Sequence, residues 1–375
     1  MLAKAAVFTA PHQQLEMREF PVPEPEPGAV LVKVEICNIC GSDLHAWRGE
    51  FDTRSIGGSL PTILGHEMIG TVAASGSGVT TDSLGQPLHA GDRVVFAYFR
   101  SCGHCEACLM GETVGCSNRF MAMLGNCEEA PHFVGGFAQF FYLPPQCTIM
   151  RVPDTLPSEL AAGVNCALSQ VIYGFERIGL KAGERVVLQG AGGLGLYATA
   201  VAREQGASQV VVIDGVPERL RLAERFGADA VIDMQAYPSP AERVRAVREL
   251  TGGGAHVVVD LTGNPAAMDE GLKMTRTFGR YLEIGNILTG QKVELDPSRL
   301  VFGNRTLMGV SLYEPRSLKK AVDFLAKTID RYPYKEAFGT ASYTLAQVNQ
   351  ALADTAERRV ARASILPWGK ERSTR

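Results

Sequence analysis

The residues of this chain best suited to chemistry begin with a cluster of cysteines. The cluster spans fifteen residues and consists of Cys102, Cys105, Cys108 and Cys116. Thiolates this close together in a reducing compartment are typical ligands of one tetrahedral Zn²⁺, whereas four free thiols would crowd without a cation. Because four sulfur ligands close the coordination sphere, such an ion has no open position for a substrate. The spacing therefore predicts a structural zinc in a lobe over about residues 102–116.

A second set of potential ligands is spread along the chain. A catalytic zinc needs three protein ligands and a vacant position, and we predict Cys40, His66 and Cys166 for this role. Cys40 and His66 lie in segments with glycine turns, and Cys166 comes just before a nucleotide-binding region. Taken singly, each would more often be a buried cysteine or a hydrogen-bonded histidine. Spacing alone does not select Cys166.

A third motif has the glycine spacing of a dinucleotide-binding turn. It comprises Gly190, Gly192, Gly193, Leu194 and Gly195, between a valine-rich strand and a helix. Such glycines let the backbone approach a pyrophosphate, while the N–H groups of the helix face the anion. Asp214 ends the next strand, where its carboxylate would bind the adenosine ribose of NAD and repel the 2′-phosphate of NADP. The motif favours NAD. Arg219 would either flank the adenosine or stay solvated.

The elements that must position these residues change in character along the chain. Up to about residue 150 the sequence contains short β-rich runs interrupted by proline and glycine. From Arg185, strands alternate with helices, which predicts a parallel sheet. A helix over 316–329 and a last helix and strand are assigned back to the first domain. We therefore predict one domain over 1–167 with 313–375, and a second over 168–312.

Composition limits the class of partner. A chain of 375 residues is too long for one ordinary core, and its formal charge of −3 provides no broad basic field. This argues against nucleic acid or an anionic membrane as partners and favours a small neutral substrate. The first residues lack a secretory pattern, and no window approaches eighteen uninterrupted apolar residues. We expect a cytoplasmic protein whose nine cysteines serve as metal ligands or thiols.

Together these motifs resemble the zinc-dependent alcohol dehydrogenases of the medium-chain dehydrogenase/reductase (MDR) superfamily over nearly the whole chain. The marks are Cys40-Gly-Ser-Asp-Leu-His45, Gly65-His66-Glu67, Gly91-Asp-Arg-Val94, the four-cysteine lobe and the glycine turn followed by Asp214. The resemblance implies an α/β protein with a GroES-like β-rich catalytic domain. The second domain would be a Rossmann domain, a doubly wound parallel sheet that binds the cofactor.

The resemblance also implies roles for individual residues. The three predicted ligands would hold the catalytic zinc, and Glu67 would lie beside it and enter its sphere when water exchanges. Asp43 would accept a hydrogen bond from the far ring nitrogen of His66. Ser42 and His45 would form the proton relay. Phe51, Tyr98 and Phe137 are candidate pocket walls, although aromatic residues are more often plain core.

The implied activity is reversible hydride transfer from a primary or secondary alcohol to NAD, with two zinc ions per chain. Sorbitol-type polyol dehydrogenases often have glutamate as the third ligand, so Cys166 favours the alcohol dehydrogenase pattern. A catalytically inactive zinc-stabilised binding protein is the rival from another class. A zinc-free quinone or enoyl reductase would lack both metal motifs. Strand pairing near Leu307–Leu312 would give a homodimer or homotetramer, as in the family.

Overall fold

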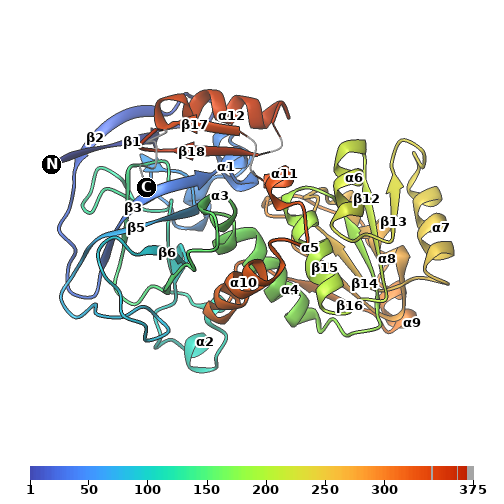
Figure 1. The fold of residues 1–375 in the computed structure, drawn as a ribbon. Coiled ribbons are helices and arrows are strands. Elements are labelled where there is room, and N and C mark those ends of the chain that lie inside the picture. The colour runs from blue at the N-terminus through green and yellow to red at the C-terminus, as the bar shows by residue number, and fades with distance from the viewer. Residues whose placement is uncertain (339–340, 361, 370–375) are drawn as a thin grey trace. The chain divides into compact units, whose positions relative to one another are not determined.

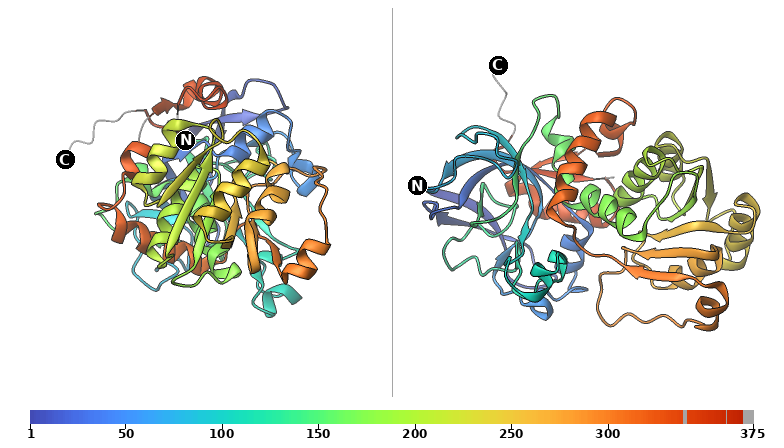
Figure 2. Two further views of the ribbon diagram at one scale, coloured as in Figure 1. Left: turned by 90° about the vertical axis from the view of Figure 1, so that its right-hand side faces the viewer. Right: turned by 90° about the horizontal axis from the view of Figure 1, so that it is seen from below.

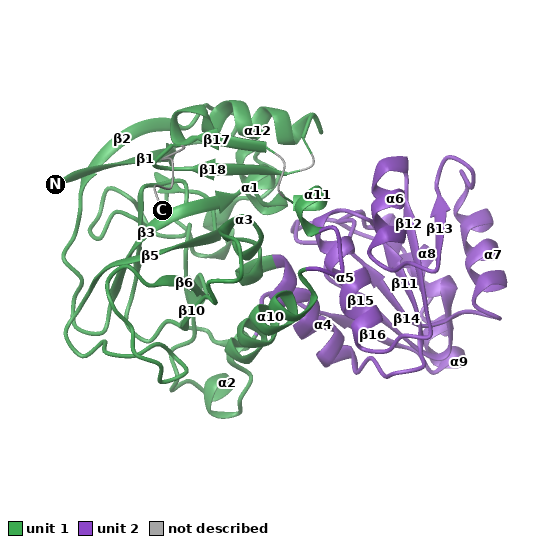
Figure 3. Ribbon diagram, in the orientation of Figure 1, with its two compact units in different colours: residues 1–166, 314–329, 334–375 green, residues 167–313, 330–333 purple. Residues whose placement is uncertain are grey.

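The computed structural model describes residues 1–338, 341–360 and 362–369. The chain forms two compact units, coloured separately in Figure 3. Unit 1 comprises residues 1–166, 314–329 and 334–375, and unit 2 comprises 167–313 and 330–333. The sequence-based division gives residues 330–333 to the first domain, whereas in the structure they belong to unit 2, where Arg331 and Tyr332 both donate hydrogen bonds to Glu204.

Unit 1 is β-rich. Its main sheet has the order β10-β6-β5-β3-β18-β17, with β9 also paired to β3. Figure 1 labels β3, β5, β6, β17 and β18 of this sheet. A smaller sheet has the order β2-β1-β4, and β7 pairs with β8. The strands are β1 (Leu2–Phe8), β2 (Glu16–Pro21), β3 (Val30–Asn38), β4 (Thr62–Ile63), β5 (Glu67–Ser75), β6 (Arg93–Phe96), β7 (Phe99–Arg100), β8 (Phe120–Met121), β9 (Phe140–Leu143), β10 (Ile149–Arg151), β17 (Ala341–Thr344) and β18 (Ala363–Leu366).

The helices of unit 1 are mostly short and lie in the connections between strands. They are α1 (Gly41–Trp47), α2 (Glu106–Leu109), α3 (Ser158–Ala161), α10 (Pro315–Thr328), α11 (Tyr334–Phe338) and α12 (Val348–Ala356). Strand β18 pairs antiparallel with β3, opposite Cys37 and Asn38. The C-terminal region is therefore part of the sheet whose strand β3 leads into Cys40.

Unit 2 is a parallel sheet with helices packed on it (Figure 2). Within the described residues its six strands have the order β13-β12-β11-β14-β15-β16, so the order reverses beside β11. This is the Rossmann order 3-2-1-4-5-6. Its elements are α4 (Ser169–Ile178), β11 (Arg185–Gln189), α5 (Gly193–Glu204), β12 (Gln209–Asp214), α6 (Pro217–Arg225), β13 (Ala230–Asp233), α7 (Pro240–Leu250), β14 (Ala255–Asp260), α8 (Ala266–Met274), β15 (Thr275–Glu283), α9 (Ser298–Gly303) and β16 (Thr306–Gly309).

The sheet of unit 2 is buried because its central strands are almost entirely apolar. Val187, Val211 and Val258 of three neighbouring strands lie in one core cluster with no exposed surface. Covering helices remove both faces of a parallel sheet from water, so continuous valine runs replace the alternating pattern of a half-exposed strand. The rigid sheet then fixes the ends of its strands, where the nucleotide turn begins.

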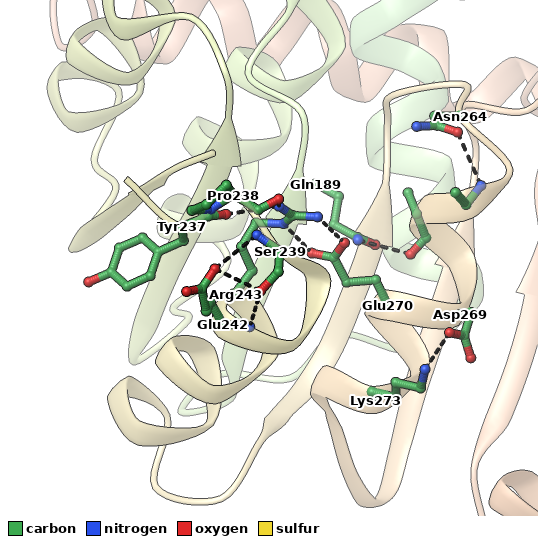
Figure 4. A network of polar contacts seen from close by, with 12 residues as sticks. Gln189, Tyr237, Pro238, Ser239, Glu242, Arg243, Asn264, Asp269, Glu270 and Lys273 are labelled. Atoms are coloured by element: carbon green, nitrogen blue, oxygen red, sulfur yellow. Dashed lines mark hydrogen bonds and ion pairs between the residues drawn. The ribbon is translucent and has the colours of Figure 1, made fainter. Parts of the chain in front are cut away.

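A polar network joins α7 and α8 of unit 2 (Figure 4). The buried guanidinium of Arg243 donates to both carboxylate oxygens of Glu270, at 2.8 and 2.7 Å, and to the carbonyls of Tyr237 and Pro238. Ser239 caps α7 in a capping box with Glu242. Because the buried ion pair is bidentate and its remaining donors bind carbonyls, this charge is satisfied without water.

The described part of the chain includes no helix with the length and apolar character needed to cross a bilayer.

Candidate functional site

The three predicted ligands of the catalytic zinc converge in unit 1. One donor atom from each of Cys40, His66 and Cys166 lies within 4.8 Å of the others. Zinc bonds to sulfur and nitrogen are about 2.0–2.3 Å long, so one ion fits between these donors after small side-chain movements. The set of two sulfurs and one nitrogen suits zinc and provides three ligands, which leaves a fourth position open.

Cys40 is presented at the start of α1. It is the N-cap residue, and its backbone N–H donates to Oδ2 of Asp43 at 2.9 Å in a capping box. The other carboxylate oxygen of Asp43 accepts from the backbone N–H of Gly65 at 3.0 Å. One fully buried aspartate therefore ties the segment of Cys40 to the segment that precedes His66.

His66 is held in a tight turn made possible by a glycine. Gly65 has φ of +90°, and a Cβ there would lie 2.6 Å from the ring of Phe137 and 2.8 Å from the sulfur of Cys37. Only glycine meets both the conformation and the close approach. Phe137 is thus a buried core residue that supports the turn.

The ring of His66 is enclosed by its neighbours. Its Nδ1 atom lies 3.6 Å from Oδ1 of Asp43, beyond hydrogen-bond range, and 3.2 Å from Sδ of Met123. Tyr98 packs against the imidazole with ring centroids 4.8 Å apart. The predicted pocket residue Tyr98 is therefore adjacent to a metal ligand. Met123 escaped sequence reasoning because a methionine in an unfamiliar segment indicates no chemistry.

The electrostatics of this cluster are those of a site prepared for a cation. A hydrogen bond from Cys166, together with the charge of His66, holds the pKa of Cys40 well below its usual range despite burial. The same hydrogen bond and burial raise the pKa of Cys166. Burial lowers the pKa of His66, but the charges of Asp43 and Cys40 outweigh it and bring the value to about 10. Metal binding would displace these protons, because thiolate and neutral imidazole are the binding forms.

Glu67, which follows His66 and is the first residue of β5, is buried and forms an ion pair. Its Oε2 atom forms an ion pair with Arg362, whose guanidinium also lies 5.2 Å from the ring centroid of Phe338. Sequence reasoning predicted Glu67 beside the metal but missed Arg362. No local signal could have found it, because the arginine is near the other end of the chain and reaches Glu67 only through the pairing of β18 with β3.

The two residues of the expected proton relay both lie on α1. Ser42 lies two residues after Cys40 on this helix, and its hydroxyl is among the groups that lower the pKa of Cys40. His45 is part-exposed, and its Nδ1 lies 2.6 Å from a carboxylate oxygen of Glu50. Because an ionised carboxylate only accepts, Nδ1 carries the proton in this pair and Nε2 is left to accept one. Glu50 is a further residue that the sequence did not indicate.

The four cysteines of the lobe also converge. Their sulfur atoms lie within 4.8 Å of one another, as one tetrahedral ion requires. The backbone N–H of Cys102 donates to the sulfur of Cys116 at 3.2 Å. Hydrogen bonding to the backbone of His104 lowers the pKa of Cys102 to about 6. The donor set fits a closed zinc site, distinct from the three-ligand cluster.

In unit 2 the glycine turn connects β11 to α5. Gly190 has φ of +105°, and a Cβ on Gly195 would lie 2.0 Å from the carbonyl oxygen of Gly190. The first glycine provides the turn and the second lets the helix pack closely on it. Gly192 is the N-cap, and Gly193 and Leu194 begin the helix, so the predicted residues form one strand-to-helix junction in which Gly193 is exposed.

Asp214 lies at the carboxyl end of β12, beside this turn. Its carboxylate accepts from the backbone N–H groups of Ala191 at 2.7 Å and Val216 at 2.9 Å. Arg219 is a looser neighbour, with Nη1 3.9 Å from the carboxylate. Asp214 therefore orders the glycine turn from the end of the neighbouring strand.

Two protein-family models match the chain. The model described as "Alcohol dehydrogenase GroES-like domain" matches residues 26–154, and the one described as "Zinc-binding dehydrogenase" matches residues 193–327. The two matches follow one another along the chain. They cover the sequence of most of unit 1 and unit 2 respectively, including Cys40, His66, the lobe, Asp214 and part of the glycine turn.

Individual proteins are similar over nearly the full length. The chain is 34% identical to a 5-exo-hydroxycamphor dehydrogenase of Pseudomonas putida over 93% of this chain and 94% of the relative. A crystal structure of an alcohol dehydrogenase from Thermotoga maritima has a TM-score of 0.90 at 30% identity, covering 98% and 99% of the two chains. A zinc-binding dehydrogenase of Sinorhizobium meliloti, solved with NADP, has a TM-score of 0.83 at 27% identity, covering 98% and 100%.

Proposed function

Because this chain belongs to the zinc-binding alcohol dehydrogenases of the MDR superfamily, we propose that it reversibly oxidises a primary or secondary alcohol to an aldehyde or ketone, with NAD as preferred coenzyme. Family membership itself makes it a zinc-containing, NAD(P)-dependent dehydrogenase acting on alcohols. The coenzyme preference, the alcohol class and the residue roles are the proposed part.

The observation that carries the proposal is the convergence of Cys40, His66 and Cys166 on one point. An inactive binding protein would need the closed four-sulfur site for stability but no second, three-ligand site. When bound there, zinc supplies a Lewis acid that lowers the pKa of a hydroxyl group at its open position. Asp43 holds the backbone of the first two ligand segments in place while this occurs.

The proton of the alcohol leaves through α1 in this proposal. Ser42 is next to the metal ligands and passes the proton on, and His45 accepts it at Nε2 because Glu50 keeps the proton of Nδ1 in place. A bound NAD would supply the acceptor for the hydride that leaves the alcohol.

Asp214 supports the preference for NAD over NADP. Its carboxylate already orders the glycine turn, and a 2′-phosphate placed against it would meet a fixed negative charge. Arg219 lies close to the same carboxylate, so part of its charge is already balanced. The relative solved with NADP shows that this preference must be measured for each member.

A homo-oligomer is also proposed. In unit 2, β16 lies at the end of the sheet order. Nearby α9 carries the exposed side chains of Val301 and Phe302, at 71% and 83% exposure. An unpaired strand edge next to apolar side chains is a surface that a second copy would cover. Size-exclusion chromatography with light scattering would distinguish a dimer or tetramer from a monomer.

The proposal is tested by metal analysis and coenzyme reduction on the purified protein. We expect about two zinc ions per chain, one for each ligand set, and NADH formation with members of a panel of apolar primary and secondary alcohols. Sorbitol in the panel tests the polyol alternative. One zinc per chain with no turnover of any alcohol would instead identify a zinc-stabilised binding protein.

A further inference from the structure

The three ligands of the proposed catalytic zinc come from segments far apart in the sequence, so other groups must set their spacing. Asp43 ties the Cys40 segment to the His66 segment through two backbone N–H groups. Neither of these two hydrogen bonds reaches the third segment, around Cys166. A comparable tie between His66 and Cys166 is needed for all three donors to be in place before an ion arrives.

Asn165, the residue before Cys166, is placed to provide that tie. Its side chain is fully buried, and Nδ2 donates to the backbone carbonyl of His66 at 3.0 Å and to that of Phe96 at 3.1 Å. One amide group thus bonds to the residue that carries the second ligand. It also bonds to the end of β6, two residues before Tyr98, whose ring packs on His66.

We propose that Asn165 is a positioning residue of the catalytic zinc centre, which fixes the spacing of His66 and Cys166 before the ion binds. The inference rests on the proposed role of the three-ligand site. Asn165 itself touches neither substrate nor metal. It acts through the backbone of His66 on one side and through its peptide bond to Cys166 on the other.

The local backbone supports this role. Residues Val164–Leu168 form one turn of π-helix directly before α4. Such turns are rare, and they are frequently found at functional sites. Here Asn165 in the turn reaches two carbonyl groups, while the sulfur of Cys166 lies within 4.8 Å of the donor atoms of Cys40 and His66.

Replacing Asn165 with a residue that lacks the amide group should weaken zinc binding at the three-ligand site. Without its two N–H donors, two buried carbonyl oxygens lose a partner, and the His66 segment is tied to the Cys166 segment chiefly by the metal itself. Part of the zinc-binding energy is then used to order the ligands. Loss of a residue that orients metal ligands typically weakens metal affinity by about 10–100-fold.

The test is a chelator titration of Asn165→Ala in the full-length, zinc-loaded protein, with retained zinc as the readout. A Cys40→Ser variant, which keeps the lobe, identifies which fraction of the zinc belongs to the four-cysteine site. We expect the catalytic zinc of Asn165→Ala to leave at a chelator concentration about 10–100-fold below that of the wild type. The lobe zinc should leave as in the wild type.

Asn349→Ala is the matched control, because Asn349 also makes two hydrogen bonds to backbone groups in unit 1, to N–H and C=O of Leu15. It should lower the melting temperature without changing the chelator profile. If Asn165→Ala does not fold, Asn165→Ser, which keeps one donor and admits water, should show a smaller selective loss. An unchanged catalytic-zinc profile in the folded Asn165 variant, or an equal change in Asn349→Ala, would overturn the inference.

The measurement separates this inference from the proposed function, because no alcohol or coenzyme is present. A wild type with two zinc ions but no turnover contradicts the proposed function, and a selective zinc loss in Asn165→Ala would still support the positioning role. A wild type that binds zinc only in the lobe contradicts both.

Discussion

The candidate sites of unit 1 and unit 2 are built from different parts of the chain. The site in unit 1 consists of side chains that repel one another or share protons until a cation is present, as the opposite pKa shifts of Cys40 and Cys166 indicate. The site in unit 2 consists of backbone, with Gly190 and Gly195 providing the shape and Asp214 ordering the turn. One site depends on an ion and the other on chain geometry.

This difference indicates which change should inactivate each site. A metal centre fails when one donor is lost, because the remaining donors cannot complete the coordination sphere. The glycine turn of unit 2, which consists of backbone, should keep its conformation when the metal is removed. Unit 2 also balances its own buried charges, as the Arg243–Glu270 pair does without any ion.

The largest expected effect follows from removing one metal donor. Cys40→Ser should lower kcat by about 10³-fold or more, since a Lewis acid contributes several kcal/mol to such a reaction. Metal analysis should show loss of one zinc per chain, while NADH binding, followed by fluorescence, should persist. Cys105→Ser is the control in the lobe, and it should lose stability and resistance to proteolysis while retaining kcat. Equal loss of folding in both variants would contradict the division of metal roles.

The next effect concerns the buried charge pair of unit 2. Glu270→Ala leaves Arg243 buried and unpaired, so it should lower the unfolding free energy by about 3–5 kcal/mol. Denaturant titration measures this loss, and the zinc content should not change. Asp269→Ala on the same helix removes a part-exposed partner of Lys273 (Figure 4) and should cost at most about 1 kcal/mol. Similar losses for both would mean that the buried pair contributes no more than a surface pair.

A smaller effect is expected on coenzyme choice. Asp214→Ser removes the charge that opposes a 2′-phosphate, and we expect the NADP-to-NAD ratio of kcat/KM to rise by about tenfold, equal to about 1.4 kcal/mol. Steady-state kinetics with both coenzymes measures the ratio. Asp233→Ser, at the end of the neighbouring strand β13, is the control and should leave it unchanged. A ratio unaffected by Asp214→Ser would remove the basis for NAD preference.

The smallest effect is a pH dependence of stability in unit 2. Glu283 faces Asp260 across β15 and β14, and burial together with the charge of Asp260 raises the pKa of Glu283 to about 7. The folded protein therefore binds more protons than the unfolded chain between the ordinary value of 4.5 and about 7. The unfolding free energy should fall as pH rises through this window.

Glu283→Gln should flatten that slope, because the amide resembles the protonated acid at every pH. Denaturant titration at several pH values measures the slope. Glu249→Gln, on an exposed position of α7, is the control and should retain it. A wild-type slope in Glu283→Gln would show that other groups cause the pH dependence.

Much of the fold was predictable because its signals are local. The helix expected over 194–204 is observed as Gly193–Glu204, and the one over 316–329 as Pro315–Thr328. The strand expected over 280–284 is longer and begins at Thr275, because β15 also pairs with β14 at Ala255, across an irregularity in the register. The family assignment to GroES-like and Rossmann domains was likewise confirmed.

Sequence by itself determined the four-cysteine lobe and the glycine turn, because closely spaced thiols and a strand followed by spaced glycines are each recognisable within one short segment. Tertiary structure alone decided the partners around them. Three such contacts join ordinary polar residues: the ion pair of Arg362 with Glu67, the hydrogen bond between Glu50 and His45, and the hydrogen bond from Asn165 to the carbonyl of His66. The residue types alone do not predict such a contact, since it depends on which strands and turns the folded chain brings together.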